Sequence, residues 1–380
     1  MTIELEIKDL SRGGSGVARH DSGRVIFVPF TAPGDRVLAR VVREEKNFAH
    51  AELVELLDPS PQRVRPKCAV FGRCGGCQWQ HLPYELQWKT KIAGAQQALK
   101  RVGVQLQTLG LPIEEFSAER VWEYRNRIQL RGEGDELGFF ASGTQTRVNA
   151  SRCEIARPEL NAAWQETREQ GAERVHPFKV EVEVLPDGSV RKSWNARHGA
   201  LGFRQVHDDQ NDKLKSWIHS EVTPGARILD LYGGSGNLSL GLGFRAAVVE
   251  CVDVGSPVGA DAQSIVRNGW GGALGAFQFF RAPVEKWVVK RAGAKNAPCF
   301  DLAILDPPRE GLAKNLTSIA DALEAMSVRR LIAVGCDPDA WAKDVSNWLK
   351  NGWQLEKVAF FDFFPQTPHV ESIAVLSKGL

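Results

Sequence analysis

The stretch ARILDLYGGSGNLSL at residues 226–240 decides the fold of the C-terminal half of this chain. It begins as a buried-type strand, continues through a glycine-rich turn and runs into an apolar segment that we expect to be a helix. Glycines in such a turn let a ligand approach the backbone, because no Cβ stands in the way. The stretch therefore predicts a ligand-binding crevice at the carboxyl end of the strand.

Further strand-like runs follow and alternate with helix-like spacers. They are AAVVECVDV (246–254), FDLAILD (300–306) and RRLIAVGC (329–336). WQLEKVAFFDFFP (353–365) and ESIAVLSKGL (371–380) come last, and we expect them to form a closing hairpin. Alternating strands and helices predict a doubly wound sheet, so residues 201–380 are expected to form a Rossmann-like α/β domain.

The N-terminal half has a different rhythm, with short strands separated by glycine and proline turns. The strands IELEIKDL, RVIFVPF, RVLARVV and HAELVELL predict a small OB-like β-barrel over residues 1–60. Residues 61–200 carry a cysteine cluster, a helical run at 84–102 and several strand-like pieces, and are expected to form a central α+β domain. We therefore expect a multi-domain protein.

Composition and charge limit the kinds of partner that this protein can have. The 43% hydrophobic and 25% charged content is typical of soluble proteins, and 380 residues exceed one ordinary core. We find no signal-peptide pattern and no run apolar enough to cross a bilayer, so we expect a cytoplasmic protein without a membrane partner. The net charge is only +2, but basic residues are dense between residues 36 and 127. A phosphate backbone would need such a footprint, and a solvated basic face is the alternative.

The glycine turn and two acids indicate the cofactor. The glycines are spaced G-G-x-G rather than G-x-G-x-x-G, and Asp230 precedes them where it would repel a pyrophosphate, which disfavours NAD. S-Adenosylmethionine carries a positive sulfonium and tolerates acids. Asp253 ends the second strand, where it could accept hydrogen bonds from ribose hydroxyls, although capping the next helix is the alternative. We therefore expect S-adenosylmethionine in this crevice.

Two later strand ends carry candidate catalytic groups. The third strand ends in Asp306-Pro307-Pro308-Arg309, and the fourth in Gly335-Cys336-Asp337-Pro338. A helix N-terminus beside Cys336 could lower its pKa and make it a nucleophile, and a buried structural thiol is the alternative. Glu371 stands before the last strand as the leading candidate for a general base, with His369 as the alternative.

These motifs, in this order and spacing, resemble the RNA 5-methyluridine (uracil-C5) methyltransferases over nearly the whole chain. The N-terminal segment resembles the TRAM barrel found in the ribosomal RNA branch of that family. The resemblance implies that Cys336 is the nucleophile and that Glu371 removes the carbon 5 proton. It also implies cofactor contacts from Gln205, Tyr232, Asn237, Asp253 and Asp306.

The chemistry of that family explains why a thiolate is needed. Carbon 5 of uracil is too poor a nucleophile to take a methyl group directly, whereas addition of a thiolate to carbon 6 turns the ring into an enolate. After methyl transfer, the carbon 5 proton must leave before the thiolate can. The family motif usually reads C-N-P, and Asp337 replaces its asparagine. An acid there would raise the pKa of Cys336 unless it is paired or turned away.

The cysteine cluster has its own resemblance. Cys68-x5-Cys74-Gly75-Gly76-Cys77, followed by Gln78-Trp79-Gln80-His81, resembles the iron–sulfur motif of the ribosomal branch. This implies that a [4Fe–4S] cluster is held by Cys68, Cys74, Cys77 and Cys153. Zinc sites usually pair their cysteines in two knuckles, whereas three clustered cysteines and a remote fourth favour the iron–sulfur cluster. Cys251 and Cys299 are expected to be packing residues.

Three functions stay open at this point. The first expectation is a monomeric RNA (uracil-5-)-methyltransferase that acts on 23S rRNA. The second is the same chemistry on the T-loop uridine of tRNA, and the third is a non-catalytic RNA-binding iron–sulfur protein. The basic stretch YRNRIQ at 124–129 includes an aromatic residue and is expected to give stacking and phosphate contacts to RNA, with a basic edge strand that binds no ligand as the alternative.

Overall fold

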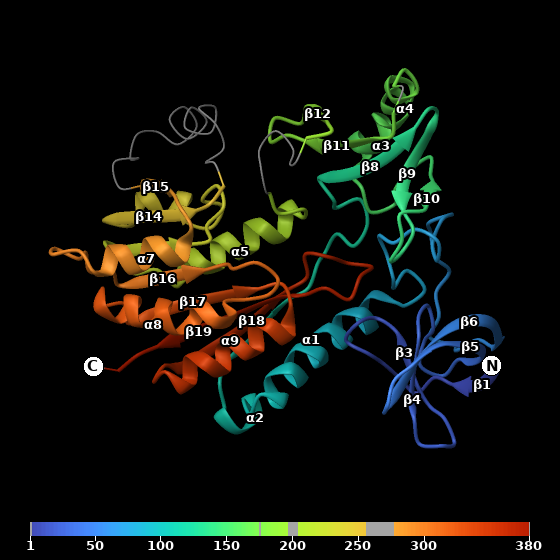
Figure 1. Cartoon of the computed structure of the whole chain (residues 1–380), viewed down its shortest axis with the longest axis horizontal. Coiled ribbons are helices and arrows are strands. Elements are labelled where there is room, and N and C mark those ends of the chain that lie inside the picture. Colours follow the sequence, from blue (N-terminus) through green and yellow to red (C-terminus); the bar gives the residue numbers. More distant parts are fainter. Residues whose placement is uncertain (1, 175, 197–203, 256–276, 380) are drawn as a thin grey trace. The chain divides into compact units, whose positions relative to one another are not determined.

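The computed structural model describes residues 2–174, 176–196, 204–255 and 277–379 (Figure 1). They divide into two compact units. Unit 1 contains Met1–Gly94, Glu119–Arg197 and Phe364–His369, and unit 2 contains Ala95–Ala118, His198–Phe363 and Val370–Leu380. The chain therefore passes repeatedly from one unit to the other. The domain boundary expected at residue 200 lies outside the described residues.

The first sheet of unit 1 contains the strands expected in residues 1–60. These are β1 (Thr2–Glu6), β2 (Asp9–Leu10), β3 (Gly16–Arg19), β4 (Val25–Val28), β5 (Arg36–Glu44) and β6 (Phe48–Asp58). They pair in the order β1-β5-β6-β4-β3-β2. Alternate residues such as Val37 and Ala39 enter a core that also holds Ile26 and Val28. Register shifts between β5 and β6 mark bulges, which increase the twist of this pair.

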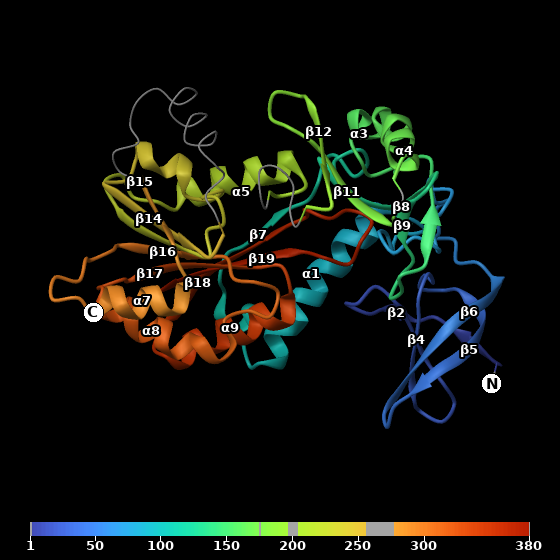
Figure 2. The ribbon, with the colours of Figure 1, turned by 45° about the horizontal axis from the view of Figure 1, so that its top comes forward.

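The second sheet of unit 1 has the order β10-β9-β8-β11-β12. Its strands are β8 (Arg127–Glu133), β9 (Glu136–Phe140), β10 (Arg147–Asn149), β11 (Phe178–Val184) and β12 (Val190–Trp194). Helices α3 (Pro158–Ala162) and α4 (Trp164–Ala172) lie beside this sheet in Figure 2, and Leu160 and Trp164 join its core. Helix α1 (Tyr84–Arg101) confirms the expected helical run.

Unit 2 is built on an eight-stranded sheet with the order β15-β14-β13-β16-β17-β19-β18-β7. Its strands are β7 (Ile113–Phe116), β13 (Arg227–Leu231), β14 (Val248–Asp253), β15 (Phe277–Arg281), β16 (Leu302–Leu305), β17 (Arg330–Gly335), β18 (Gln354–Phe361) and β19 (Glu371–Ser377). Strands β13 to β17 pair in parallel, and β18 and β19 form the expected antiparallel hairpin. The sequence did not indicate β7, because four residues are too few to show a period.

The helices of unit 2 connect these strands. They are α2 (Leu106–Leu109), α5 (Asp208–Ser220), α7 (Val284–Ala292), α8 (Leu316–Ala325) and α9 (Pro338–Lys350), with 3-10 turns η1 (Leu240–Phe244) and η3 (Ala313–Asn315). The expectation of an α-helix directly after the glycine loop is wrong, because only the short 3-10 turn η1 follows the loop. Gly241 and Gly243 lie in this segment and disfavour an α-helix. Within the described ranges, no helix is both long and apolar enough to span a membrane.

Candidate active site and cysteine cavity

The ends of four strands meet at one edge of the unit 2 sheet. Leu231 of β13 lies opposite Leu305 of β16, which lies opposite Ala333 of β17. Strand β19 runs antiparallel to β17 and begins where β17 ends, with Ser372 opposite Gly335. The residues that come next at this edge are Tyr232, Asp306, Cys336 and Glu371.

Cys336 and Glu371 are therefore neighbours across the β17–β19 pair. Glu371 is buried, with 2% of its surface exposed, and Cys336 is half-buried. Burial, followed by the charges of Glu371 and Asp306, raises the pKa of the Cys336 thiol to about 12, while Arg309 opposes this shift. Burial and Asp306 raise the pKa of Glu371 well above its usual range, and Arg309 again opposes the shift. In the protein alone, the Cys336 thiol is therefore almost entirely protonated at neutral pH.

Asp306 belongs to a group of three acids at this edge. Burial, Asp230 and then Asp253 raise the pKa of Asp306 to about 7. Arg309 is exposed and follows Asp306 in the same loop, where it lowers the pKa of both Cys336 and Glu371. Sequence reasoning identified the tetrapeptide but not this electrostatic role of its arginine.

Asp337 caps the helix that follows the nucleophile candidate. Its Oδ1 accepts hydrogen bonds from the backbone N–H groups of Asp339 and Ala340, both at 3.0 Å, at the N-terminus of α9. Its carboxylate is thus engaged by the helix, and the principal causes of the raised thiol pKa are burial, Glu371 and Asp306. The acid in place of the family's asparagine serves as an N-cap.

Asp344 fastens the loop that carries Arg309. It lies on α9, and its Oδ2 accepts a hydrogen bond of 2.7 Å from the backbone N–H of Leu312. The loop needs this support because Ala313, which is not a glycine, has a φ of +47°. No pattern in the sequence distinguishes Asp344 from an ordinary helix-surface acid.

The glycine loop lies next to the buried side chains of Asp230 and Ser239. Asp230 is fully buried, and its side chain hydrogen-bonds Ser239 and Cys251. A Cβ at Gly233 would lie 2.4 Å from Asp230 Oδ2 and 2.5 Å from Cys251 Sγ, so only glycine fits there. Asp230 Oδ1 is buried and has no hydrogen-bond partner among the described residues. Burial raises the pKa of Asp230 to about 6.

The other cofactor candidates surround this loop. Asp253 Oδ2 accepts from Gly234 N at 3.1 Å, so its carboxylate lies against the loop. The Tyr232 hydroxyl donates to Glu285 Oε1 at 2.8 Å, which holds a residue whose φ is +61°. Asn237 exchanges two side-chain hydrogen bonds with Asn211, of 3.0 and 2.8 Å. Gln205 is buried ahead of α5. Glu285 and Asn211 were not identified from the sequence.

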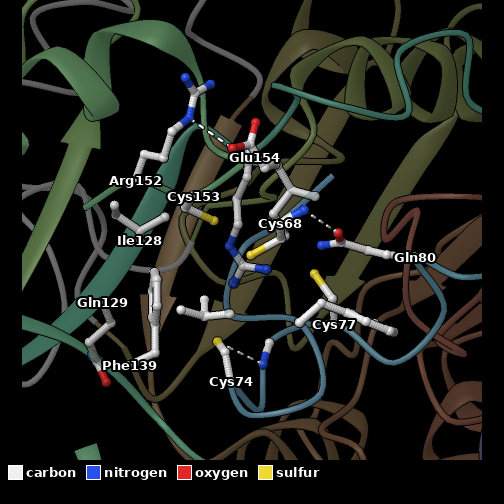
Figure 3. Close-up of a pocket in the computed structure, with 15 residues that line it drawn as sticks. Cys68, Cys74, Cys77, Gln80, Ile128, Gln129, Phe139, Arg152, Cys153 and Glu154 are labelled. Atoms are coloured by element: carbon white, nitrogen blue, oxygen red, sulfur yellow. Dashed lines mark hydrogen bonds and ion pairs between the residues drawn. The ribbon is translucent and has the colours of Figure 1, made fainter. Parts of the chain in front are cut away.

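The four cysteines of the expected cluster line one cavity of about 180 Å³ in unit 1 (Figure 3). Cys68, Cys74 and Cys77 come from the loop between β6 and α1, and Cys153 follows β10. Burial raises the pKa of Cys77 to about 12, and the other three cysteines add to this shift. The sulfur atoms are thus within electrostatic reach of one another. Among the described residues, no three His, Cys, Asp or Glu side chains are grouped to hold a single metal ion.

Two amide side chains hold the cysteine backbone in place. Gln80 Oε1 accepts from Cys68 N at 3.0 Å, and the same side chain hydrogen-bonds the Cys77 thiol. Asn161 Oδ1 accepts from Cys153 N at 2.9 Å, while its Nδ2 donates to the Cys153 carbonyl oxygen at 3.0 Å. Asn161 therefore holds both the N–H and the carbonyl group of the remote fourth cysteine.

Part of the positive charge between residues 36 and 127 is neutralised by ion pairs within the protein. Several arginines in this range form ion pairs, among them Arg36 with Glu4 and Arg40 with Glu52. The expected stacking role of the 124–129 stretch is wrong for Tyr124, which is 2% exposed and cannot offer its ring to a base. Strand β8, which begins at Arg127 within this stretch, lies inside the sheet, between β9 and β11, and is not an edge strand.

Comparisons with known proteins cover the whole chain. Residues 1–54 match the TRAM domain family, and residues 191–379 match the tRNA (uracil-5-)-methyltransferase family. An uncharacterised RNA methyltransferase of Bdellovibrio bacteriovorus is 33% identical, over 98% of this chain and 94% of the relative. Another, from Thermosynechococcus vestitus, is 30% identical over 100% of this chain and 98% of the relative.

One solved structure is similar over its full length. It is the Pyrococcus abyssi tRNA (uracil-54, C5)-methyltransferase in complex with S-adenosyl-L-homocysteine, with a TM-score of 0.73 and 22% identity. The match covers 98% of this chain and 100% of that chain, and at this identity it shows the fold. The two sequence relatives and the two matched domains confirm the expected family: the chain belongs to the RNA uracil-5-methyltransferases that carry a TRAM domain.

Proposed function

We propose that this chain methylates carbon 5 of uridine in 23S rRNA, with Cys336 as nucleophile and Glu371 as general base. The observation that carries the proposal is the register of β17 and β19, which sets Cys336 beside Glu371 at the edge where the parallel strands end. The family membership of the chain supports the same reaction.

The reaction divides into three steps at these two side chains. The Cys336 thiol gives its proton to solvent, and the thiolate adds to carbon 6 of uracil, which places the electron pair on carbon 5 and the carbonyl oxygen of carbon 4. Carbon 5 then takes the methyl group of S-adenosylmethionine, and the electron pair of the broken carbon–sulfur bond stays on the sulfur. The Glu371 carboxylate removes the carbon 5 proton, the double bond between carbons 5 and 6 reforms, and the carbon–sulfur bond breaks to release the thiolate.

The raised pKa values of both groups determine how the site must be activated. Burial is the main reason that the pKa of the Cys336 thiol is about 12, so little thiolate is present in the protein alone. The guanidinium of Arg309 favours the charged forms of both groups. We therefore assign Arg309 the role of increasing the thiolate fraction when the site closes on RNA.

S-Adenosylmethionine supplies the methyl group as a sulfonium, and the glycine loop fits it. Gly234 leaves open space where a side chain would lie, and Asp253 lies against the loop, where it could accept from ribose hydroxyls. The unpartnered oxygen of Asp230 leaves a hydrogen-bond acceptor beneath the loop. Gln205, Tyr232, Asn237 and Asp306 are the remaining proposed contacts.

The cysteine cavity fits a [4Fe–4S] cluster held by Cys68, Cys74, Cys77 and Cys153. All four thiols line the same cavity, and a cluster supplies structural cross-linking there once the thiols are deprotonated. Backbone N–H groups of Ile155 and Ala156 hydrogen-bond Cys153 sulfur, and the Gly76 N–H donates to Cys74 Sγ at 3.4 Å. Such N–H donors commonly surround cluster sulfurs.

Two RNA substrates are candidates. The T-loop uridine of tRNA is the second candidate, because a tRNA (uracil-54, C5)-methyltransferase shares the fold over the whole chain. We propose residues 1–60 as an RNA-binding barrel, 61–200 as the cluster domain and 201–380 as the catalytic domain. The enzyme would act as a cytoplasmic monomer.

Two experiments test the proposal. RNA containing 5-fluorouridine should form a covalent adduct with the wild-type protein, because fluorine at carbon 5 cannot leave as a proton, and Cys336→Ala should form none. Methyl transfer that persists in Cys336→Ala would refute the nucleophile. Mapping of 5-methyluridine in ribosomal and transfer RNA from a deletion strain identifies the substrate. If no RNA loses the mark and no adduct forms, the non-catalytic iron–sulfur alternative gains.

The cluster has a separate test. Protein purified without oxygen should contain about four irons per chain and absorb as an iron–sulfur protein. Cys153→Ser should lose iron, whereas Cys299→Ser, which changes an exposed thiol outside the cavity, should retain it. Stoichiometric zinc without iron would refute the cluster.

A further inference from the structure

The segment Phe364–His369, which we call the strap, connects the two strands of the closing hairpin. The chain leaves unit 2 after Phe363, contributes the strap to unit 1 and returns to unit 2 at Val370. Glu371 follows directly, as the first residue of β19. The position of the proposed general base is therefore linked, through one intervening residue, to whatever holds the strap.

Backbone groups of the cysteine motif hold the strap at its centre. The carbonyl oxygen of Gln366 accepts two hydrogen bonds of 3.0 Å, from the N–H groups of Gln78 and Trp79. These are the two residues directly after Cys77. The strap is thus docked on the same short loop that supplies three of the four cavity cysteines.

A buried pair of glutamines completes this attachment. Gln87 on α1 is fully buried and Gln366 is 2% exposed. Gln87 Oε1 accepts from Gln366 N at 2.9 Å, and Gln87 Nε2 lies 3.0 Å from Gln366 Oε1. The same Nε2 reaches the carbonyl oxygens of Leu82 at 2.9 Å and Trp79 at 3.1 Å. One amide group therefore joins the helix, the cysteine loop and the strap.

Further side chains of unit 1 hold the residues before Gln366. The buried Lys91 ammonium donates to the Phe364 carbonyl oxygen at 2.9 Å, and the Tyr124 hydroxyl donates to that of Pro365 at 3.1 Å. Buried polar groups joined in this way rigidify a structure, because each would be costly to leave unpaired. Tyr124, excluded above as a base-stacking residue, thus has a structural partner in the strap.

The backbone of the strap also needs external support. Gln366 has a φ of +71°, a conformation that non-glycine residues adopt only at a cost of about 1–3 kcal/mol when the surroundings enforce it. The two N–H donors and Gln87 enforce it here. Strained residues that their surroundings hold in place cluster at functional sites, and Gln366 stands five residues before Glu371.

We propose that Gln87 and Gln366 are positioning residues, which hold the strap on the cysteine loop and so place Glu371 for proton removal from carbon 5. This rests on the proposed function of Glu371. The rival explanation is that the pairing of β19 with β17 and β18 fixes Glu371 without help from the strap. The two differ in what happens when the strap is loosened and the sheet is left intact.

The test uses Gln87→Ala and Gln366→Gly in the full-length protein as purified. Gln366→Gly removes the amide but suits a positive φ, so it loosens the strap without adding strain. Gln97→Ala, an exposed glutamine on the same helix, is the matched control. We would measure kcat, the KM values for S-adenosylmethionine and RNA, iron content, and the fraction of protein covalently bound to natural uridine RNA.

We expect kcat to fall about 10²-fold in both variants, because a general base displaced by about 1 Å loses that much. The KM values should stay within about twofold, and Gln97→Ala should match wild type. The methylated covalent adduct should accumulate, since the thiolate addition and methyl transfer precede the slowed proton removal. A merely structural role would lower all steps together and give no accumulation.

Three outcomes separate the possibilities. If both variants keep kcat within about twofold, β19 alone positions Glu371 and the proposal is wrong. If kcat falls without accumulation of adduct, the glutamines act through stability, and the proposal is again wrong. If the wild-type protein forms no adduct with 5-fluorouridine RNA, the proposed function itself is wrong. This outcome does not depend on the strap variants, so the two failures are distinguishable.

Discussion

The reactivity of Cys336 in the RNA-free protein should depend on Glu371 and not on Asp337. Asp337 is adjacent in sequence, but its carboxylate is bonded to the start of α9, whereas Glu371 and Asp306 are the acids that raise the thiol pKa. Glu371→Gln should therefore lower the pKa of Cys336 and speed its reaction with a disulfide reagent. Asp337→Asn should leave the rate unchanged.

The expected rate follows from the pKa of about 12. At pH 8 the thiolate fraction of such a thiol is about 10⁻⁴, against roughly a quarter for an ordinary thiol with a pKa of about 8.5. The greater nucleophilicity of a more basic thiolate recovers part of this difference, which leaves Cys336 roughly 60-fold slower. Its rate should rise about tenfold per pH unit from pH 7 to 10, because the thiolate fraction does so below the pKa.

The assay is modification by a disulfide reagent between pH 7 and 10, with each cysteine quantified by peptide mass spectrometry. Cys299 is exposed and gives an internal comparison in the same sample. Two results would refute the reasoning. One is a Cys336 rate equal to that of Cys299 at pH 8, and the other is an equal acceleration by Asp337→Asn and Glu371→Gln.

Three further predictions concern stability and the cysteine cavity. Asp337→Ala should lower the free energy of unfolding in urea by about 1 kcal/mol through loss of the N-cap, whereas Asp337→Asn should cost only a few tenths. Gly233→Ala should cost about 1–3 kcal/mol, because its Cβ would collide with Cys251 Sγ, and Cys251→Ala should recover part of this in a double-mutant cycle. Asn161→Ala should speed iron release to a chelator, because it frees the peptide unit of Cys153.

Each of these has a contradicting result. Equal losses for Asp337→Ala and Asp337→Asn would show that the cap is not the source of the stability. A Gly233→Ala cost that Cys251→Ala leaves unchanged would assign the collision to Asp230 instead. Iron release from Asn161→Ala at the same rate as from Gln165→Ala, a nearby surface change, would show that the cysteine needs no anchoring.

The sequence alone determined the parts that depend on local pattern. Period-2 strands, the glycine turn and the alternation of strands with helices predicted the α/β sheet and its hairpin, because side-chain burial in those elements follows spacing along the chain. The motifs also singled out Cys336, Glu371 and the four cavity cysteines as candidate functional residues, a prediction that the proposed experiments test. The missed β7 and the absent helix after the glycine loop lie where the local signal was short or misleading.

Only the tertiary structure decided what surrounds those residues. It showed that the carboxylate of Asp337 caps helix α9, and that Glu371 and Asp306 are close enough to raise the pKa of the Cys336 thiol. It also joined Gln87 to Gln366 across 279 positions of sequence. Such contacts depend on where distant segments pack, and burial and charge act through space, so no spacing within the sequence could reveal them.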